Sequence, residues 1–359
     1  MTRRRKLTFF VLLLMISFLG SALSLELIVR MTFPQPTGPV MFSYDPAIGV
    51  IPKPSQSALR TLSEDPPYRA SNDSEGLRVS WSANSDSSEK NRRRVLFLGD
   101  SYVYGSGVSD EATFASVFAK ITGYRAINAG VPGTGNDFAL KFLKVRARAY
   151  RPDTVVIGFF PNDYADNMGG RFFEHRPDGT LSDVDVAASF AFYRNKQKLG
   201  EYRLYNWFCE NSHAFNLARK LAAWLKVSGG LGDVRAFLKN RPDMTLFERG
   251  FSNATNIEQA EQLFRIIRDE VRAIGAQLLV LYIPTPVEVL NFRQTKQASR
   301  DELALVETLR KLDIELISTT APLAESGIDQ AQLYLNEGHW NVEAHQIAGA
   351  LLASRLTSN

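Results

Sequence analysis

From residue 94 onwards, short apolar runs alternate with amphipathic stretches. The runs Val95–Leu98, Thr154–Gly158 and Gln277–Ile283 lack polar alternation, which is typical of strands buried on both faces of a parallel sheet. Two further strands are predicted at Ala126–Asn128 and Ile314–Ile317. Between these strands, apolar residues recur at helical spacing in Thr113–Ile121, Asp137–Tyr150, Ile257–Ile274, Glu302–Leu312 and Val342–Leu356. This alternation predicts a three-layer α/β/α fold over residues 94–359, with a doubly wound parallel sheet of about five strands.

The first thirty residues follow a different pattern. Leu7–Leu25 contains no charge, and a basic tetrad at residues 3–6 precedes it. At about 1.5 Å per residue this stretch spans roughly 28 Å as a helix, close to the ~30 Å hydrocarbon core of a bilayer. We therefore expect residues 1–30 to form a cytoplasmic stub and a single-pass anchor, in contact with the membrane through residues 7–29.

The basic end then stays in the cytoplasm, so the rest of the chain is periplasmic or otherwise extracytoplasmic. A cleaved signal peptide is the alternative, because Ala22-Leu23-Ser24 fits a small-x-small cleavage site.

Residues 31–93 have the composition of a spacer. Eight of the 16 prolines fall between Pro34 and Pro67, and seven serines lie between Ser71 and Ser88. Such a composition resists helix formation and favours extended chain. We expect an extended linker without a fold of its own, from which short pieces around residues 44–46 and 76–78 pack on the domain.

An insertion at about residues 169–256 interrupts the alternation between the third and fourth predicted strands. Its aromatic residues include Phe172, Phe173, Tyr202, Tyr205, Trp207 and Phe208. Two interpretations remain open. The insertion is either a cap over the site that sets substrate choice, or an accessory helical layer that buries these aromatics.

The charge balance excludes one class of protein. The chain has 42 Lys and Arg against 38 Asp and Glu, a net charge of +4, and the basic tetrad accounts for the whole excess. No basic face is left for nucleic acid, so no nucleic-acid partner is expected. The single cysteine, Cys209, excludes an intramolecular disulfide and a cysteine-based metal site. We expect no cofactor and no metal.

Candidate chemistry lies where the predicted strands end. Ser101 follows the first strand, Gly130 the second and Asn162 the third, and His339 comes just before the last helix. The carboxyl ends of parallel strands meet at one edge of the sheet, so Ser101, Gly130 and Asn162 should converge on one crevice. A serine, a distant histidine, a backbone N–H and a side-chain amide are the parts that acyl transfer from a serine nucleophile requires.

Four motifs strengthen this interpretation. GDSYVYGSG, NAGVPGTG, GFFPNDYADN and EGHWN resemble blocks I, II, III and V of the SGNH (GDSL-type) hydrolases, in the same order. With its apolar N-terminus, the chain resembles a membrane-anchored member of bacterial type. The resemblance implies a flavodoxin-like SGNH hydrolase fold, Ser101 as nucleophile and His339 as general base. It also implies an oxyanion hole made by the N–H groups of Ser101 and Gly130 and the Asn162 amide.

The third member of the triad departs from that pattern. The family carries an aspartate three residues before the histidine, or two before it in some subgroups, whereas this chain has Asn336 and Glu337 there. We expect Glu337 to hold the tautomer and the charge of His339. In the alternatives, Asn336 merely orients the ring, or the acid is absent or comes from elsewhere in the chain.

Together these features predict a serine esterase that removes acetyl or other short acyl groups from an extracytoplasmic glycan, lipid or small ester through an acyl-serine intermediate. One alternative is an O-acyltransferase in cell-surface polysaccharide modification, supplied by an acyl-transfer partner in the envelope. The other is a non-catalytic glycan-binding module with an incomplete triad.

Overall fold

The computed structural model of the chain describes residues 3–62, 65–81, 92–167, 172–176, 178, 180–227 and 250–358. At its centre is a five-stranded sheet in the order β11-β10-β7-β5-β6, in which every neighbouring pair is parallel. This is the flavodoxin-like order, so the predicted α/β fold is confirmed. The strands are β5 (Arg94–Leu98), β6 (Arg125–Asn128), β7 (Thr154–Phe159), β10 (Gln277–Tyr282) and β11 (Glu315–Ser318).

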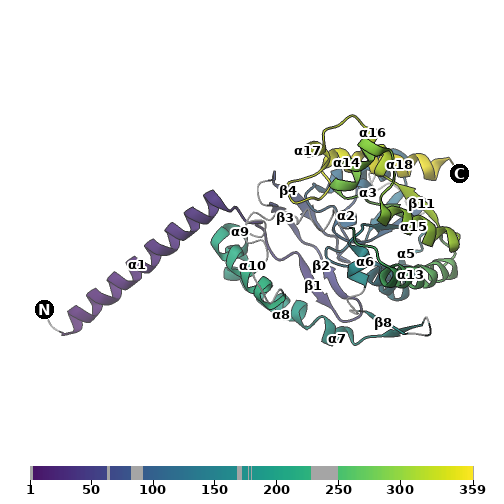
Figure 1. Ribbon diagram of the computed structural model, residues 1–359. Helices are drawn as coiled ribbons and strands as arrows, with labels where there is room; N and C mark the ends of the chain where they lie inside the picture. Colours follow the sequence, from purple (N-terminus) through teal and green to yellow (C-terminus); the bar gives the residue numbers. More distant parts are fainter. Residues whose placement is uncertain are drawn as a thin grey trace.

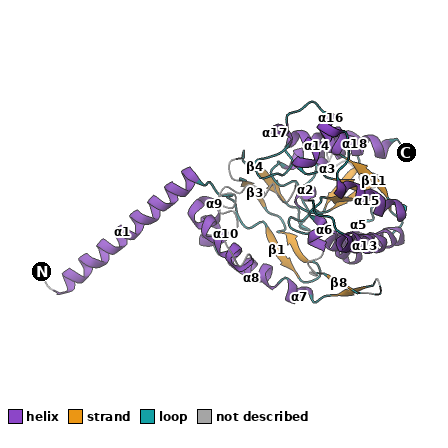
Figure 2. Cartoon of the chain, viewed as in Figure 1, coloured by secondary structure: helices purple, strands orange, loops and turns teal. Residues whose placement is uncertain are grey.

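Helices cover both faces of this sheet (Figures 1 and 2). One hydrophobic core joins alternate strand residues such as Leu96 and Val280 to α4 (Asn136–Phe142), α13 (Ala254–Ala273) and α15 (Arg300–Lys311). The other core joins residues such as Phe97 and Leu281 to α3 (Phe114–Thr122), α14 (Pro286–Thr295), α16 (Thr320–Glu325) and α18 (Val342–Thr357). Because successive residues of a strand point to opposite faces, a continuous apolar run feeds both cores.

Shorter helical elements connect these layers. They are α2 (Ser101–Tyr104), a 3₁₀ turn at Asp110–Ala112, a π turn at Leu143–Ala147, α5 (Arg148–Tyr150), α6 (Asp163–Asp166) and α17 (Gln330–Leu333). The predicted helix Asp137–Tyr150 is thus observed as α4, the π turn and α5 in succession.

The described residues of the expected linker, 31–62, 65–81 and 92–93, are not simply extended chain. They contain two antiparallel hairpins, one of β1 (Phe42–Asp45) and β2 (Gly49–Pro52), the other of β3 (Ser57–Arg60) and β4 (Tyr68–Ser71). Ile48 and Val50 are buried in the same core as the sheet, and Arg78 bridges to Asn128 at the end of β6. Prolines keep the strands short, but enough apolar side chains remain to pack the segment onto the domain.

The insertion starts with a hairpin of β8 (Phe173–His175) and β9 (Leu181–Asp183). In the described part of the insertion this hairpin is followed by the helices α7 (Val186–Ser189), α8 (Ala191–Gly200), α9 (Arg203–Asn211) and α10 (His213–Val227). Phe172 and Phe173 are buried in the main core and α8 lies against β1, as expected of an accessory layer. Trp207 and Tyr202 are exposed. The interpretation as a cap also involves residues 168–171 and 228–249, which lie outside the described residues.

A single N-terminal helix, α1 (Arg3–Thr32), extends away from this body (Figure 1). It is the one helix among the described residues that is long and apolar enough to cross a membrane, and its apolar stretch is exposed throughout. A signal sequence has the same character.

Candidate active site

Ser101 lies at the first position of α2, directly after β5. Asp100 precedes it as the N-cap, and its Oδ1 accepts a hydrogen bond from the Tyr102 N–H at 2.9 Å. The sharp turn depends on Gly99, whose φ is +151° and where a Cβ would lie 2.5 Å from Val103 Cγ2. The chain therefore presents the Ser101 side chain at the carboxyl edge of the sheet.

His339 reaches Ser101 from the loop before α18. Its Nε2 lies 2.7 Å from Ser101 Oγ, although 238 residues separate the two in sequence. A second hydrogen bond joins α2 to the loop that carries His339, since the Tyr102 hydroxyl donates to the Gly338 carbonyl at 2.8 Å. The Tyr102 ring stacks on Phe160 and lies 5.0 Å from the His339 ring. Tyr102 belongs to the first motif, GDSYVYGSG, and no spacing or composition marked it separately.

The other ring nitrogen of His339 faces an acid. Nδ1 makes a short hydrogen bond with Glu337 Oε1, and the two side chains are 23% and 18% exposed. Burial disfavours the charged imidazole, but the charge and hydrogen bond of Glu337 outweigh that effect. Helped by Asp100 and Asp65, Glu337 raises the pKa of His339 above its ordinary 6.5.

Asn336, the alternative position, faces away from the imidazole. Its backbone N–H and its Nδ2 both donate to Asp65 Oδ1, at 3.1 and 2.8 Å. Asp65 is buried and belongs to the segment expected as a linker, 271 residues earlier in the chain. It holds the loop that carries Glu337 and His339, and nothing in the local sequence pattern pointed to it.

Asn162 follows β7 and is the N-cap of α6. Its Nδ2 donates to Asp166 Oδ2 at 3.0 Å. A side-chain amide has two N–H donors, so this bond occupies one of them.

Gly130 follows β6 and lies against the back of α2. Its N–H donates to Asn128 Oδ1 at 3.0 Å, and Asn128 Nδ2 in turn donates to the Val103 carbonyl at 2.7 Å. A Cβ at Gly130 would lie 2.3 Å from the Tyr104 nitrogen. This glycine is therefore needed for the close approach of the β6 end to the back of α2, and its N–H serves that junction. The Gly130 N–H is engaged by Asn128 in this structure, and its part in an oxyanion hole stays a prediction.

Two buried carboxyl groups lie behind Ser101. Burial, with the nearby charge of Asp166, raises the pKa of Asp100 to about 6. The hydrogen bond from the Tyr102 N–H and the charge of His339 act in the opposite direction. Burial and the neighbouring charges of Asp100 and Asp166 raise the pKa of Asp163 well above its ordinary value. Asp163 is an internal hydrogen-bond acceptor, since its Oδ2 accepts from the Phe160 N–H and Asn136 Nδ2. Across the described residues, no cluster of three or more His, Cys, Asp or Glu side chains could hold a metal ion.

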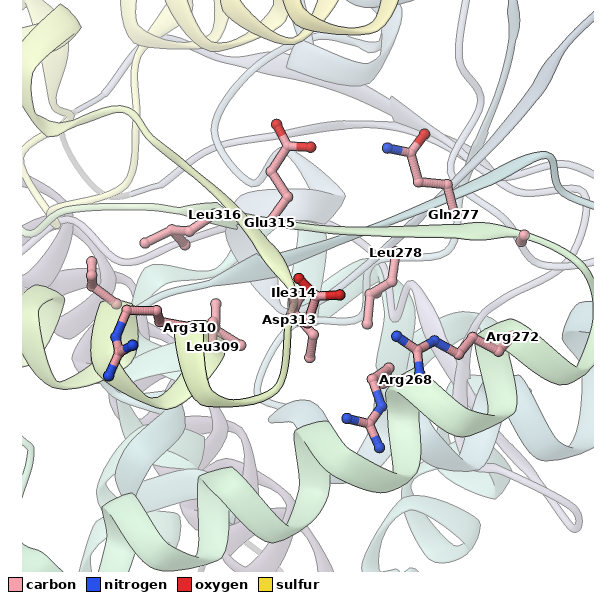
Figure 3. Close-up of a pocket in the computed structure, with 12 residues that line it drawn as sticks. Arg268, Arg272, Gln277, Leu278, Leu309, Arg310, Asp313, Ile314, Glu315 and Leu316 are labelled. Carbon is pink, nitrogen blue, oxygen red and sulfur yellow. The ribbon is translucent and has the colours of Figure 1, made fainter. Parts of the chain in front are cut away.

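A cavity of about 440 Å³ opens beside the His339 loop, lined by Asp65, Asn336 and Gly338 together with Pro286 and Gln330. A second cavity, of about 650 Å³, lies at the amino ends of β10 and β11, at the opposite edge of the sheet (Figure 3). Arg268, Arg272 and Arg310 line it, and it contains none of the predicted site residues.

The sequence matches no family model and no curated protein. Solved structures with a similar course of the chain include several esterases that are 10–14% identical to it. A two-domain esterase active on acetylated mannans is 14% identical with a TM-score of 0.41, covering 76% of this chain and 50% of that one.

An acetylxylan esterase from Geobacillus stearothermophilus is 11% identical, with a TM-score of 0.40 and coverage of 74% and 94%. A lipolytic protein of the G-D-S-L family from Desulfitobacterium hafniense is 10% identical, with a TM-score of 0.38 and coverage of 73% and 99%. The chain spans about half the length of the two-domain mannan esterase.

Proposed function

We propose that the protein is a serine esterase in which Ser101, His339 and Glu337 form the catalytic triad. The observation that carries this proposal is the continuous contact from Glu337 Oε1 through both ring nitrogens of His339 to Ser101 Oγ. An acceptor on Nδ1 keeps the proton there and leaves Nε2 free to take the proton of the hydroxyl. This arrangement argues against an incomplete triad.

In the proposed reaction, Ser101 Oγ attacks the ester carbonyl carbon while its proton passes to His339 Nε2. The tetrahedral intermediate collapses, the bond to the alcohol breaks, and Nε2 returns the proton to the leaving oxygen. Water then hydrolyses the acyl-serine by the same steps. The Glu337 carboxylate stabilises the imidazolium that exists between the two proton transfers.

Two donors are available for the negative oxygen of the intermediate. The Ser101 N–H belongs to the first turn of α2, where helical N–H groups have no intrahelical acceptor. The second is the Asn162 N–H that is not used on Asp166. Losing one such donor typically costs about 2.7 to 4 kcal/mol of barrier.

The cavity beside the His339 loop suits the alcohol part of the ester. Carboxylate and amide groups of Asp65, Gln330 and Asn336 line it, alongside the apolar faces of Pro66 and Pro286. In ligand pockets an apolar lining buries the ligand and a few polar groups fix its orientation, a combination that suits a molecule with several hydroxyl groups. We therefore favour an acylated glycan as the substrate, with α1 as an uncleaved anchor that places the domain outside the cytoplasm.

The test is hydrolysis of p-nitrophenyl acetate by the full chain in detergent. Activity should fall to the uncatalysed rate in Ser101→Ala and remain in Ser354→Ala, which changes an exposed serine of α18. Activity that survives Ser101→Ala would overturn the proposal. Adding an oligosaccharide acceptor separates hydrolysis from transfer, since a transferase forms an acetylated sugar at the expense of free acetate.

A further inference from the structure

The outer end of α1 is built into the body of the protein. The Glu26 carboxylate accepts hydrogen bonds from the Ser212 hydroxyl at 2.7 Å, the His213 N–H at 2.9 Å and the Ala214 N–H at 3.0 Å. The last two groups are unpaired donors at the start of α10, so a carboxylate from α1 caps this helix. Glu26 directly follows the last residue of the charge-free stretch.

Further contacts hold the C-terminal end of α1 against α9 and α10, and together with those of Glu26 we call them the joint. Arg30 Nη2 donates to the Asn211 carbonyl at the end of α9, at 2.7 Å. Val29 is 4% exposed, and the Gln35 N–H donates to His213 Nδ1 at 2.8 Å. With so many contacts at one place, α1 is held at a defined orientation to α9 and α10 instead of being a loose tether.

Helix α9 carries an exposed apolar stripe next to this joint. Leu204, Trp207 and Phe208 are 68%, 54% and 36% exposed, and their i, i+3, i+4 spacing places them on one helix face. The next position on that face is Asn211, whose carbonyl binds Arg30. We call Leu204, Trp207 and Phe208 the α9 stripe. The opposite face of α9 is turned to the protein, where Cys209 is buried.

The position of α9 follows from the joint. Figure 1 shows α9 and α10 beside the C-terminal end of α1, on the side of the body from which the long helix departs. The charge-free stretch of α1 spans roughly 28 Å, about the thickness of the hydrocarbon core, so Glu26 lies at the level of the lipid headgroups. Ser212 contacts Glu26 and directly follows α9. The end of the α9 stripe nearest Ser212, at Phe208, therefore lies at the depth where the bilayer meets water.

We propose that the α9 stripe is inserted into the interface of the outer leaflet, so that the domain rests on the lipid surface at a fixed tilt. Tryptophan is enriched at this interface because its ring combines an apolar body with one polar N–H. Burying the stripe also removes exposed apolar side chains from water beside the membrane. The inference rests on the proposed anchor, but not on the proposed chemistry at Ser101.

The experiment uses the full chain in nanodiscs of phosphatidylcholine, with and without bromine on the acyl chains near the glycerol. Bromine quenches tryptophan only on close approach, so the emission of Trp207 should fall in the brominated discs. Trp207 is one of four tryptophans, which limits the decrease to about a quarter of the total. Trp207→Phe should abolish this decrease, while Trp81→Phe should leave it in place.

A second variant keeps Trp207 as the reporter. Leu204→Glu combined with Phe208→Glu should lift α9 from the lipid and abolish the quenching, while the chain stays in the membrane through α1. Leu303→Glu is the matched control, because Leu303 is an exposed leucine (56%) of α15, in a different layer of the molecule. It should leave the quenching unchanged.

The inference is overturned if bromine quenches the wild type and Trp207→Phe equally, or if the double glutamate variant is quenched like the wild type. It is also overturned if Trp207 is quenched by acrylamide from the water and not by bromine, or if neither quencher reaches it because a partner protein covers it. If alkaline carbonate extracts the chain from the membrane, the proposal that α1 is an uncleaved membrane anchor is wrong. Hydrolysis of p-nitrophenyl acetate should be unchanged in the double glutamate variant, and quenching unchanged in Ser101→Ala, so the two proposals fail separately.

Discussion

The role of Glu337 is open to a direct perturbation. Glu337→Gln keeps the size of the side chain and an oxygen that accepts from His339 Nδ1, but it removes the negative charge. The pair is near the surface, with 23% and 18% of the side chains exposed, so an effective dielectric constant of about 20 is appropriate. Two opposite charges about 4 Å apart then attract by about 4 kcal/mol.

The imidazolium forms on the way to the transition state, so Glu337→Gln should raise the activation barrier by most of this attraction. At about 1.4 kcal/mol per tenfold change in rate, kcat should fall by about 10³. KM should change little, because Glu337 acts through His339. The pKa of His339 should fall as well, since burial then opposes its charge without the main compensating group.

The assay is steady-state hydrolysis of p-nitrophenyl acetate between pH 5 and 9, with Glu325→Gln as the control for an exposed glutamate on α16. Asn336→Ala separates the two candidate positions and should cost far less than Glu337→Gln. The reasoning is refuted if Glu337→Gln keeps kcat within a factor of about three of the wild type, or if Asn336→Ala causes the larger loss.

Further predictions concern charge and packing around the site. Activity should decline on acidification with a midpoint above pH 6.5, because the pKa of His339 is raised and only the neutral ring accepts the proton. Asp65→Asn should move this midpoint to lower pH in kcat/KM profiles. An unmoved midpoint would exclude an influence of Asp65 on the pKa of His339. Burial, with nearby positive charge, lowers the pKa of His345 to about 3, so its neutral form stabilises the fold above pH 6.5 and this contribution is lost as the pH falls. Urea unfolding should show a loss of about 3 kcal/mol by about pH 4 that is absent in His345→Gln. Gly130→Ala should destabilise the fold by about 1 to 3 kcal/mol, because the new Cβ would meet the backbone of Tyr104, and kcat of the folded fraction should be nearly unchanged. A stable variant with kcat reduced a hundredfold would support the Gly130 N–H as a donor in the oxyanion hole.

The sheet was predictable because buried parallel strands appear as unbroken apolar runs, as in Thr154–Phe159, where every residue is buried. The strand-end rule brought Ser101, Gly130 and Asn162 to one edge, whereas the meeting of Ser101 with His339 was expected from the resemblance of the motifs. The hairpins of residues 31–93 were not predictable in this way. Their strands are only four residues long, and the prolines around them suggested extended chain.

Side-chain orientation was also beyond the sequence pattern. A glycine after a strand indicates close approach of the backbone, but it does not say whether its N–H faces the substrate or, as at Gly130, the folded-back side chain of Asn128. Asp65 contacts Asn336 across 271 residues, and no local spacing encodes such a pair. The charge of Glu337 already favoured it over Asn336 in the sequence, but the contact by which Asp65 holds Asn336 could not be predicted.

The most direct test of the central claim is covalent labelling of the folded chain by a fluorophosphonate. Such a reagent phosphonylates a serine only where a base removes its proton and donors stabilise the charged intermediate. Mass spectrometry of the digested full chain should find a single adduct on Ser101, with labelling strongly slowed in His339→Ala and in Glu337→Gln. A folded chain that stays unlabelled at Ser101, or is labelled equally fast in His339→Ala, would contradict the proposed triad.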